Sequence, residues 1–200
     1  MPLTIQLLMG TSLAACAGLR AWMPLLIAGL LVRGHYIPVN PGYAWLGRDE
    51  ALIVFGVATL VEFVADKIIG LDHVMDVVGT AVRPAAGVVL ASSMLTRSDP
   101  LAATVVGLIA GGGTSFTIHA GKAALRAKSS LMAPAHGGLG NAALSLGEDF
   151  IAGAGVWTAA HAPVIAFLVT LAALAGAAWL AIHAVKMGKR GMAWLRGQAR

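Results

Sequence analysis

The sequence predicts an all-α membrane protein that crosses the bilayer several times. Hydrophobic residues make up 58% of the 200-residue chain, charged residues make up only 12%, and the mean hydropathy is +0.81. Soluble domains carry about 25% charged residues, and a spanning helix needs about 20 mostly apolar residues. Several stretches of the chain meet that requirement. The excess of 14 Lys+Arg over 9 Asp+Glu lies mostly in loops and the C-terminal tail. It therefore indicates helix orientation rather than nucleic-acid binding.

An internal repeat predicts how these helices are arranged. Residues 10–21 read GTSLAACAGLRA and residues 113–124 read GTSFTIHAGKAA, with six of the twelve paired positions identical at a spacing of 103. If each half crosses the membrane three times, the second half must point the opposite way to the first. We therefore expect about six transmembrane helices in two inverted three-helix repeats. The expected single membrane domain covers 1–200, with halves at 1–98 and 99–186 and a basic tail at 187–200.

The first half contains two clear apolar helices and one ambiguous segment. Residues 3–32 form the first, in which Pro24 should kink or break the helix. Residues 50–69 form the second, after a polar loop at 34–49. The apolar run 84–96 would span only about 20 Å as a helix, which is too short for a hydrocarbon core of about 30 Å. This helix must borrow residues from 71–83, or 71–96 must be re-entrant or partly buried.

The second half contains one long apolar helix at 100–127, which includes the triple glycine at 111–113, followed by a Gly/Ser/Pro-rich loop at 128–141. Residues 150–185 then include no Asp, Glu, Lys or Arg. As one helix they would extend about 54 Å, too long for one span. We therefore predict a break at His161-Ala-Pro163 between helices at about 141–160 and 164–186.

Basic residues in the expected loops predict the orientation. With six spans, both termini and the second and fourth loops share one side. The nine basic residues assigned to that side are Lys67, Arg83, Arg126, Lys128, Lys186, Lys189, Arg190, Arg196 and Arg200, against Arg33, Arg48 and Arg97 on the other. Because cytoplasmic loops are enriched in Lys and Arg, we expect a multi-pass inner-membrane protein with both termini in the cytoplasm.

Acidic residues within the apolar helices are the first candidates for function. Glu62 and Asp66 are four residues apart and so share a helix face, and Glu148 and Asp149 lie in the helix expected at 141–160. A charge in a spanning helix costs about 2.5–3.5 kcal/mol on insertion scales, and such groups usually mark ion or proton pathways. We expect Glu62 and Glu148, in similar places of the two halves, to bind a cation or proton. The alternatives are interfacial acids, or acids paired with cations such as Arg83.

Basic residues within the helices are the second candidates. Arg20 lies in the first apolar helix, and Lys122 is nearly its repeat mate. Each could bind a small anionic ligand or pair with the acids. His119 matches Cys16 in the repeat and could carry a proton near neutral pH, or simply bond a neighbouring carbonyl.

Other site types have weaker support. Asp72, His73 and Asp76 offer oxygen and nitrogen ligands at near-helical spacing, but no fixed metal-binding motif is present, and a solvated turn explains them equally well. We expect no cofactor, and no enzyme activity, because no nucleophile–base pairing is found. The glycine-rich faces predict close helix packing, which could also form a homodimer in the lipid bilayer.

Several short motifs together resemble a bacterial membrane family. They are Gly18-Leu-Arg20-Ala-Trp-Met-Pro24-Leu, Glu62-Phe-Val-Ala-Asp66-Lys67-Ile, Asp72-His73, Arg83-Pro84-Ala-Ala-Gly87 and His119-Ala-Gly-Lys122. The chain resembles domain of unknown function 4126 over roughly residues 8–185. The resemblance implies a bacterial membrane location and no assigned activity.

The residues then favour a small transporter or channel-like protein. It would move a cation, a proton or a proton-coupled solute by alternating access, with the halves rocking about the acids. One alternative is a lipid-handling protein that uses Arg20, Arg83, Lys122 and Arg126 to hold a phosphate headgroup. The other is a non-catalytic membrane scaffold that packs a partner through its glycine faces.

Overall fold

The structure is all-helical, as the sequence predicts. The computed structural model describes residues 1–65, 71–132 and 139–198, and the side chains of 1–65, 77–126 and 145–186. Within these ranges there is no strand. The elements are α1 (Leu3–Leu19), α2 (Trp22–Arg33), η1 (Pro41–Gly47), α3 (Asp49–Ala65), α4 (Leu71–Ser93), α5 (Pro100–Val106), η2 (Gly107–Gly112), α6 (Gly113–Met132), α7 (Leu139–His161) and α8 (Pro163–Gln198).

The segment predicted as the first span, residues 3–32, forms two helices, α1 and α2, with a reversal of the chain between them. Arg20 has extended backbone angles, φ −136° and ψ 127°, and ends α1. The Gln6 side chain near the start of α1 accepts a hydrogen bond from the Thr96 amide, and Asn40, which follows α2, donates to Ser93 and Leu95 carbonyls. Both ends of α1–α2 therefore reach the same segment, so this pair is a helical hairpin that returns to its own side.

The break in this hairpin is not at Pro24, where the sequence predicted it. Pro24 lies in the first turn of α2. The first backbone N–H groups of a helix have no intrahelical partner, so a proline in this turn removes no helical hydrogen bond. The chain instead turns at Arg20 and Ala21, so the predicted break within 3–32 is present but lies about one turn before Pro24.

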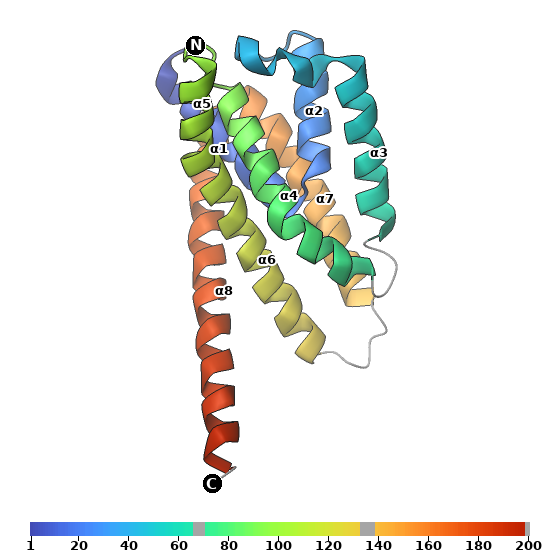
Figure 1. Cartoon of the computed structure of the whole chain (residues 1–200), viewed down its shortest axis with the longest axis vertical. Helices are drawn as coiled ribbons and strands as arrows, with labels where there is room; N and C mark the ends of the chain where they lie inside the picture. The colour runs from blue at the N-terminus through green and yellow to red at the C-terminus, as the bar shows by residue number, and fades with distance from the viewer. Residues whose placement is uncertain (66–70, 133–138, 199–200) are drawn as a thin grey trace.

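The remaining helices run back and forth along the long axis of the molecule (Figure 1). α4 runs through Pro84 without interruption for 23 residues, about 35 Å, so it reaches across the bundle. The predicted helix at 84–96 thus takes its missing length from residues before Pro84. α5, η2 and α6 follow one another from Pro100, with a π-helical turn at the glycines. The predicted break holds, because α7 ends at His161 and α8 begins at Pro163.

The hairpin changes the relation between the two halves. The start of α1 contacts Thr96, shortly before α5 begins, and the end of α1 contacts Lys122 in α6. The repeat segments 10–21 and 113–124 therefore run in the same direction, whereas an inverted repeat would make them antiparallel. The cause is that α2 leads back to the end of the bundle where α1 begins, so only α3 and α4 run along the bundle before the second half begins. The structure thus contradicts the inverted arrangement.

The two ends of the chain also lie apart. Figure 1 places the start of α1 and the end of α8 at opposite ends of the long axis. The side of the membrane on which each terminus lies stays a prediction. α8 also continues as a helix to Gln198, through most of the segment predicted as a tail.

Two described helical segments are long and apolar enough to cross a membrane, Pro100–Arg126 and Pro163–Lys186. Shorter apolar segments are Leu3–Leu19, Trp22–Arg33 and Val77–Ser93. The outer faces of several helices expose large apolar side chains, including Ile53, Leu60, Leu108, Phe150 and Leu168. Apolar exposure on this scale is unusual for a soluble monomer and fits a lipid environment.

Glycine allows the central helices to approach closely. A Cβ on Gly18 would lie 2.5 Å from the Ser115 carbonyl oxygen, at the crossing of α1 and α6. A Cβ on Gly111 would lie 2.4 Å from the Gly87 carbonyl oxygen, where the π turn meets α4. These glycines pack helices within the chain, as small residues do in membrane proteins. The possibility of a homodimer through glycine faces stays a prediction.

Candidate functional site

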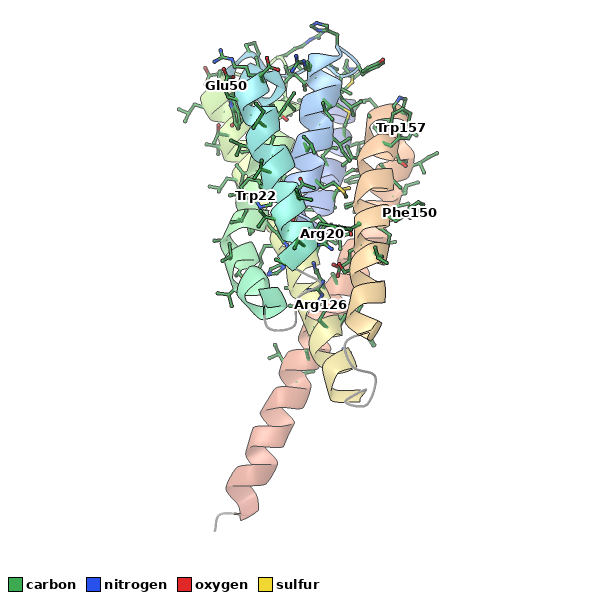
Figure 2. The ribbon with its side chains drawn as sticks, turned by 90° about the vertical axis from the view of Figure 1, so that its right-hand side faces the viewer. Arg20, Trp22, Glu50, Arg126, Phe150 and Trp157 are labelled. Carbon is green, nitrogen blue, oxygen red and sulfur yellow. The ribbon has the colours of Figure 1, made fainter. Side chains whose placement is uncertain are left out.

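The break between α1 and α2 lies among ionisable side chains from four other helices. Figure 2 shows Arg20 at this level, between the hairpin and α7. We call the group around the break the charged cluster. Its members are Arg20, Glu62, Arg83, His119, Lys122, Arg126, Glu148 and Asp149.

The free end of α1 is held by a lysine. Lys122 of α6 donates from Nζ to the carbonyl oxygen of Leu19, the last residue of α1, over 2.9 Å. Lys122 is 6% exposed. The last carbonyls of a helix have no intrahelical partner and carry partial negative charge, so a cation is favourable there.

The free end of α2 faces a carboxylate. The backbone N–H groups of Ala21 and Trp22 lie 3.5 Å from the two Glu62 carboxylate oxygens. Glu62, in the last turn of α3, is buried at 4% exposure. An arginine on α4, Arg83, approaches the same carboxylate at 3.6 Å. The charges of Arg83 and Glu62 compensate one another. The negative charge of Glu62 is also stabilised by the partial positive charge at the N-terminus of α2.

The turn itself is tied to α7. Arg20 Nε lies 2.7 Å from Asp149 Oδ1, and the guanidinium donates to Ser145 Oγ over 2.6 Å. It also donates to the Ser145 carbonyl over 3.3 Å. The Arg20 side chain is 2% exposed. These contacts fix the backbone reversal to a helix 125 residues away along the chain.

Glu148, the neighbour of Asp149, joins two cations of α6. Its Oε2 atom lies 2.8 Å from Lys122 Nζ and 3.0 Å from an Arg126 guanidinium nitrogen. The Glu148 side chain is 14% exposed. The carboxylate therefore connects α7 to α6 and, through Lys122, to the end of α1.

His119 is held in one tautomer by its neighbours. Arg83 lies 2.5 Å from His119 Nδ1, and Thr80 Oγ1 lies 3.2 Å from Nε2. Because arginine can only donate, Nδ1 must accept, and Nε2 carries the proton and donates to Thr80. His119 is therefore a neutral imidazole in this arrangement.

The structure brings six of the sequence-predicted residues into the cluster. They are Arg20, Glu62, His119, Lys122, Glu148 and Asp149. Asp66 lies outside the described residues, and so do the side chains of Asp72, His73 and Asp76. Among the side chains that are described, no three His, Cys, Asp or Glu residues are grouped for metal binding.

The sequence counted two further cluster residues, Arg83 and Arg126, among the basic residues that set the orientation, and named both as possible ligands of a phosphate headgroup. Arg83 is 1% exposed in the middle of α4, and the Arg126 side chain is 11% exposed in α6. One sequence signal could have placed Arg83 inside a helix. The apolar run 84–96 is too short to span a membrane, so residues before Pro84, including Arg83, were needed to complete the helix. The sequence carried no comparable signal for Thr80 or Ser145.

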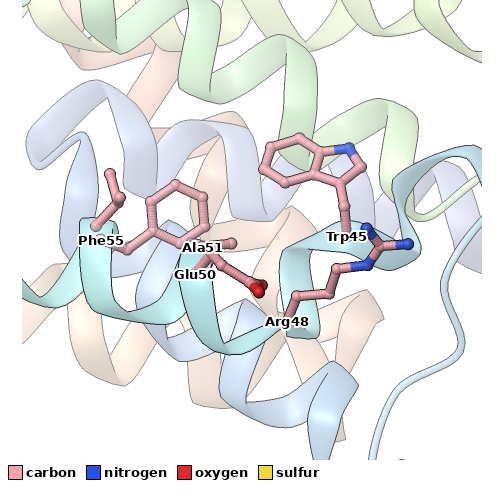
Figure 3. A pocket seen from close by; sticks show the side chains of 6 residues that line it. Trp45, Arg48, Glu50, Ala51 and Phe55 are labelled. Atoms are coloured by element: carbon pink, nitrogen blue, oxygen red, sulfur yellow. The ribbon is translucent and has the colours of Figure 1, made fainter.

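The described pockets lie away from the cluster. Figure 3 shows one at the start of α3, lined by Trp45, Arg48, Glu50, Ala51, Val54 and Phe55. Glu50 and Glu62 are twelve residues apart on this helix, about 18 Å. A second pocket lies between the residues after α2 and η1. Five cluster residues, Arg20, Glu62, Arg83, His119 and Lys122, are at most 6% exposed, whereas the side chains of Glu148 and Asp149 are 14% and 21% exposed.

The comparisons with known proteins identify a family and nothing closer. Neither curated proteins nor solved structures give a match. The family model described as domain of unknown function (DUF4126) matches residues 7–183, which confirms the resemblance seen in the sequence motifs. The chain therefore belongs to the DUF4126 family.

Proposed function

We propose that this protein is a small membrane transporter that moves protons, or a small solute coupled to protons, by alternating access. One observation carries the proposal: a helix is broken inside the bundle, and ionisable side chains hold both freed ends. Lys122 binds the end of α1, and Glu62 faces the start of α2. Broken helices with their ends aimed at charged groups form the binding sites of many transporters.

The contacts of the acids favour a proton over a metal cation. Glu62, Glu148 and Asp149 each contact a basic side chain. A metal cation would have to displace those cations from the carboxylates. A proton instead neutralises a carboxylate and weakens its ion pair, which would free the hairpin to move. The buried cluster then corresponds to an occluded state, and movement of the α1–α2 hairpin takes the place of rocking between inverted halves.

A lipid-handling function is the second candidate. The four basic residues that could hold a phosphate headgroup, Arg20, Arg83, Lys122 and Arg126, all lie in the one cluster. Their described acidic contacts would have to open for a headgroup to enter. A purely structural scaffold is less well supported, because a scaffold does not require so many ionisable groups in its interior.

The transport proposal is tested in liposomes. Purified protein is reconstituted with a trapped pH-sensitive dye, and a potassium gradient with valinomycin sets the potential. We expect proton entry above that of protein-free liposomes, either alone or when a mixture of small organic ions is added. Scrambling of a fluorescent phospholipid, with no proton movement, would favour the lipid-handling function. Flux no greater than in protein-free liposomes under all conditions would refute transport.

We further propose that α3, α4, α5–α6, α7 and α8 cross the membrane and that the α1–α2 hairpin enters and leaves on one side. Arg83 is buried and Arg126 is paired with Glu148 inside the bundle, so we leave both out of the count. The bias on the side of the C-terminus then falls from nine basic residues to seven, against three. That bias still predicts a cytoplasmic end for α8. The start of α1 is then on the outer side.

Reporter fusions check this topology. A fluorescent protein that matures only in the cytoplasm should be bright after Arg200 and dark before Met1. Alkaline phosphatase, active only outside the cytoplasm, should show the reverse pattern. The same result at both ends would restore an even number of crossings and contradict the hairpin.

A further inference from the structure

Lys122 occupies a position lined by oxygen atoms at the helix break. Its Nζ lies 2.9 Å from the Leu19 carbonyl oxygen and 2.8 Å from Glu148 Oε2. Leu19 is the last residue of α1, because the extended backbone at Arg20 ends the helix there. Its carbonyl is one of the four at a helix end that have no intrahelical donor. A backbone carbonyl and a carboxylate thus converge on one buried positive charge.

The same set of oxygen atoms suits a small monovalent metal ion. In transporters with broken helices, half-helix carbonyls coordinate Na⁺ near the middle of the membrane, and carboxylates and carbonyls are preferred ligands of hard cations. We propose that the Lys122 ammonium occupies a monovalent-cation site formed by the Leu19 carbonyl and the Glu148 carboxylate. The chain supplies its own cation there, and removal of the amine creates a site for Na⁺.

If the transport function proposed above holds, the presence of a lysine at position 122 makes the proton, rather than Na⁺, the coupling ion. The other strong cations of the cluster, Arg20, Arg83 and Arg126, keep their charge at every physiological pH. A buried lysine can release its proton. When Lys122 passes its proton to Glu148, the carboxylate is neutralised as proposed above, and the ion pair beside the helix break is lost. Release of that proton from Glu148 to one side and reprotonation of Lys122 from the other side restore the ion pair, so one proton crosses per cycle.

The groups around Lys122 set this balance. Arg20 follows α1, Arg83 projects from α4, and Arg126 and His119 share α6 with the lysine. Glu148 and its neighbour Asp149 come from α7. Burial disfavours the charged form of Lys122 most, Arg83 and Arg126 also oppose its charge, and Glu148 favours it. The part of α8 from 163 to 185 has no Asp, Glu, Lys or Arg, and its His183 is exposed. The other titratable residues on helices next to Lys122 are Cys16 on α1 and Asp72, His73 and Asp76 on α4. The side chains of those three α4 residues are not described.

The test is Lys122→Met, which keeps most of the apolar stem and removes the ammonium. The melting temperature of the purified variant is measured in NaCl and in choline chloride at equal ionic strength. We expect NaCl to raise it by about 3 °C or more relative to choline, because an ion that binds only the folded state stabilises it. The unmodified protein should melt at the same temperature in both salts.

Arg126→Gln is the matched control. It also removes a cation from Glu148 but leaves Lys122 against Leu19, so it should show no preference for Na⁺. Lys122→Ala, with more room, repeats the test if Lys122→Met does not fold. Equal melting temperatures in the two salts would overturn the proposal, and so would failure of both lysine variants to fold in NaCl, since Na⁺ should replace the missing charge. If Lys122→Met melts higher in NaCl but the unmodified protein moves no protons, the cation site stands and the transport function is refuted. If the unmodified protein moves protons but Lys122→Met melts equally in both salts, transport stands and the cation site is refuted.

Discussion

Arg20→Met should destabilise the protein more than any other single change to the charged cluster. The substitution removes the buried guanidinium that bonds Asp149 and Ser145 and that fixes the reversal between α1 and α2. Breaking a buried ion pair by removing one partner costs about 3–5 kcal/mol. We expect about 3 kcal/mol, because the Asp149 side chain is 21% exposed and water can partly solvate it. For a domain of this size that lowers the melting temperature by about 6–12 °C.

Two further variants make the Arg20 measurement specific. Arg33→Met removes an exposed arginine that pairs with Asp49, and exposed pairs contribute at most about 1 kcal/mol. The double variant Arg20→Met/Asp149→Leu replaces the buried pair by apolar side chains, which is often neutral or stabilising. It should recover most of the lost melting temperature. If Arg20→Met melts like Arg33→Met, Arg20 does not hold the hairpin.

Composition was sufficient to predict the helical class and several helix boundaries. The break between α7 and α8 was visible because an uncharged run was too long for one span and contained Pro163. The continuous path of α4 through Pro84 was one of the two alternatives that the length of a spanning helix left open. In both cases a local sequence signal and the thickness of the bilayer acted together.

The break at Arg20 could not be predicted in the same way. Its cause is a set of contacts with α7, which is more than 120 residues away in the chain. The nearest local signal was Pro24, and a proline in the first turn of a helix breaks nothing. The error then spread to the topology. The repeat showed that 10–21 and 113–124 are alike, but their relative direction depends on how many helices cross between them.

The site was more predictable than the path of the chain. Ionisable groups in apolar helices are costly, so most of them gather in the interior, where opposite charges meet. Which partners meet depends on tertiary structure, and Arg83 and Arg126 show this. The sequence counted both among the basic residues that orient the protein, and it left open a pairing of the acids with Arg83. The structure pairs Arg83 with Glu62 and Arg126 with Glu148.

Glu62→Gln should abolish proton-coupled flux by the protein. Glutamine keeps the shape of the side chain and an oxygen that faces the N-terminus of α2, but it has no negative charge for Arg83 and cannot take up a proton. If protonation of Glu62 is the step that frees the α1–α2 hairpin, the variant resembles the protonated state at all times and cannot return to the charged state. We expect flux in liposomes to fall at least about tenfold, more than 1.4 kcal/mol in the barrier. Glu148→Gln should do likewise, because Glu148 holds the Lys122 side of the break.

A second readout separates this effect from simple loss of structure. Cys16, the only cysteine of the chain, lies on α1 one turn before Arg20 and is 8% exposed. A maleimide should label it slowly in the unmodified protein and faster in Glu62→Gln, because the weakened hairpin opens more often to water. Glu50→Gln, on the exposed first turn of the same helix, should change neither flux nor labelling. A folded Glu62→Gln protein with normal flux and slow labelling would show that Glu62 serves only as the buried partner of Arg83.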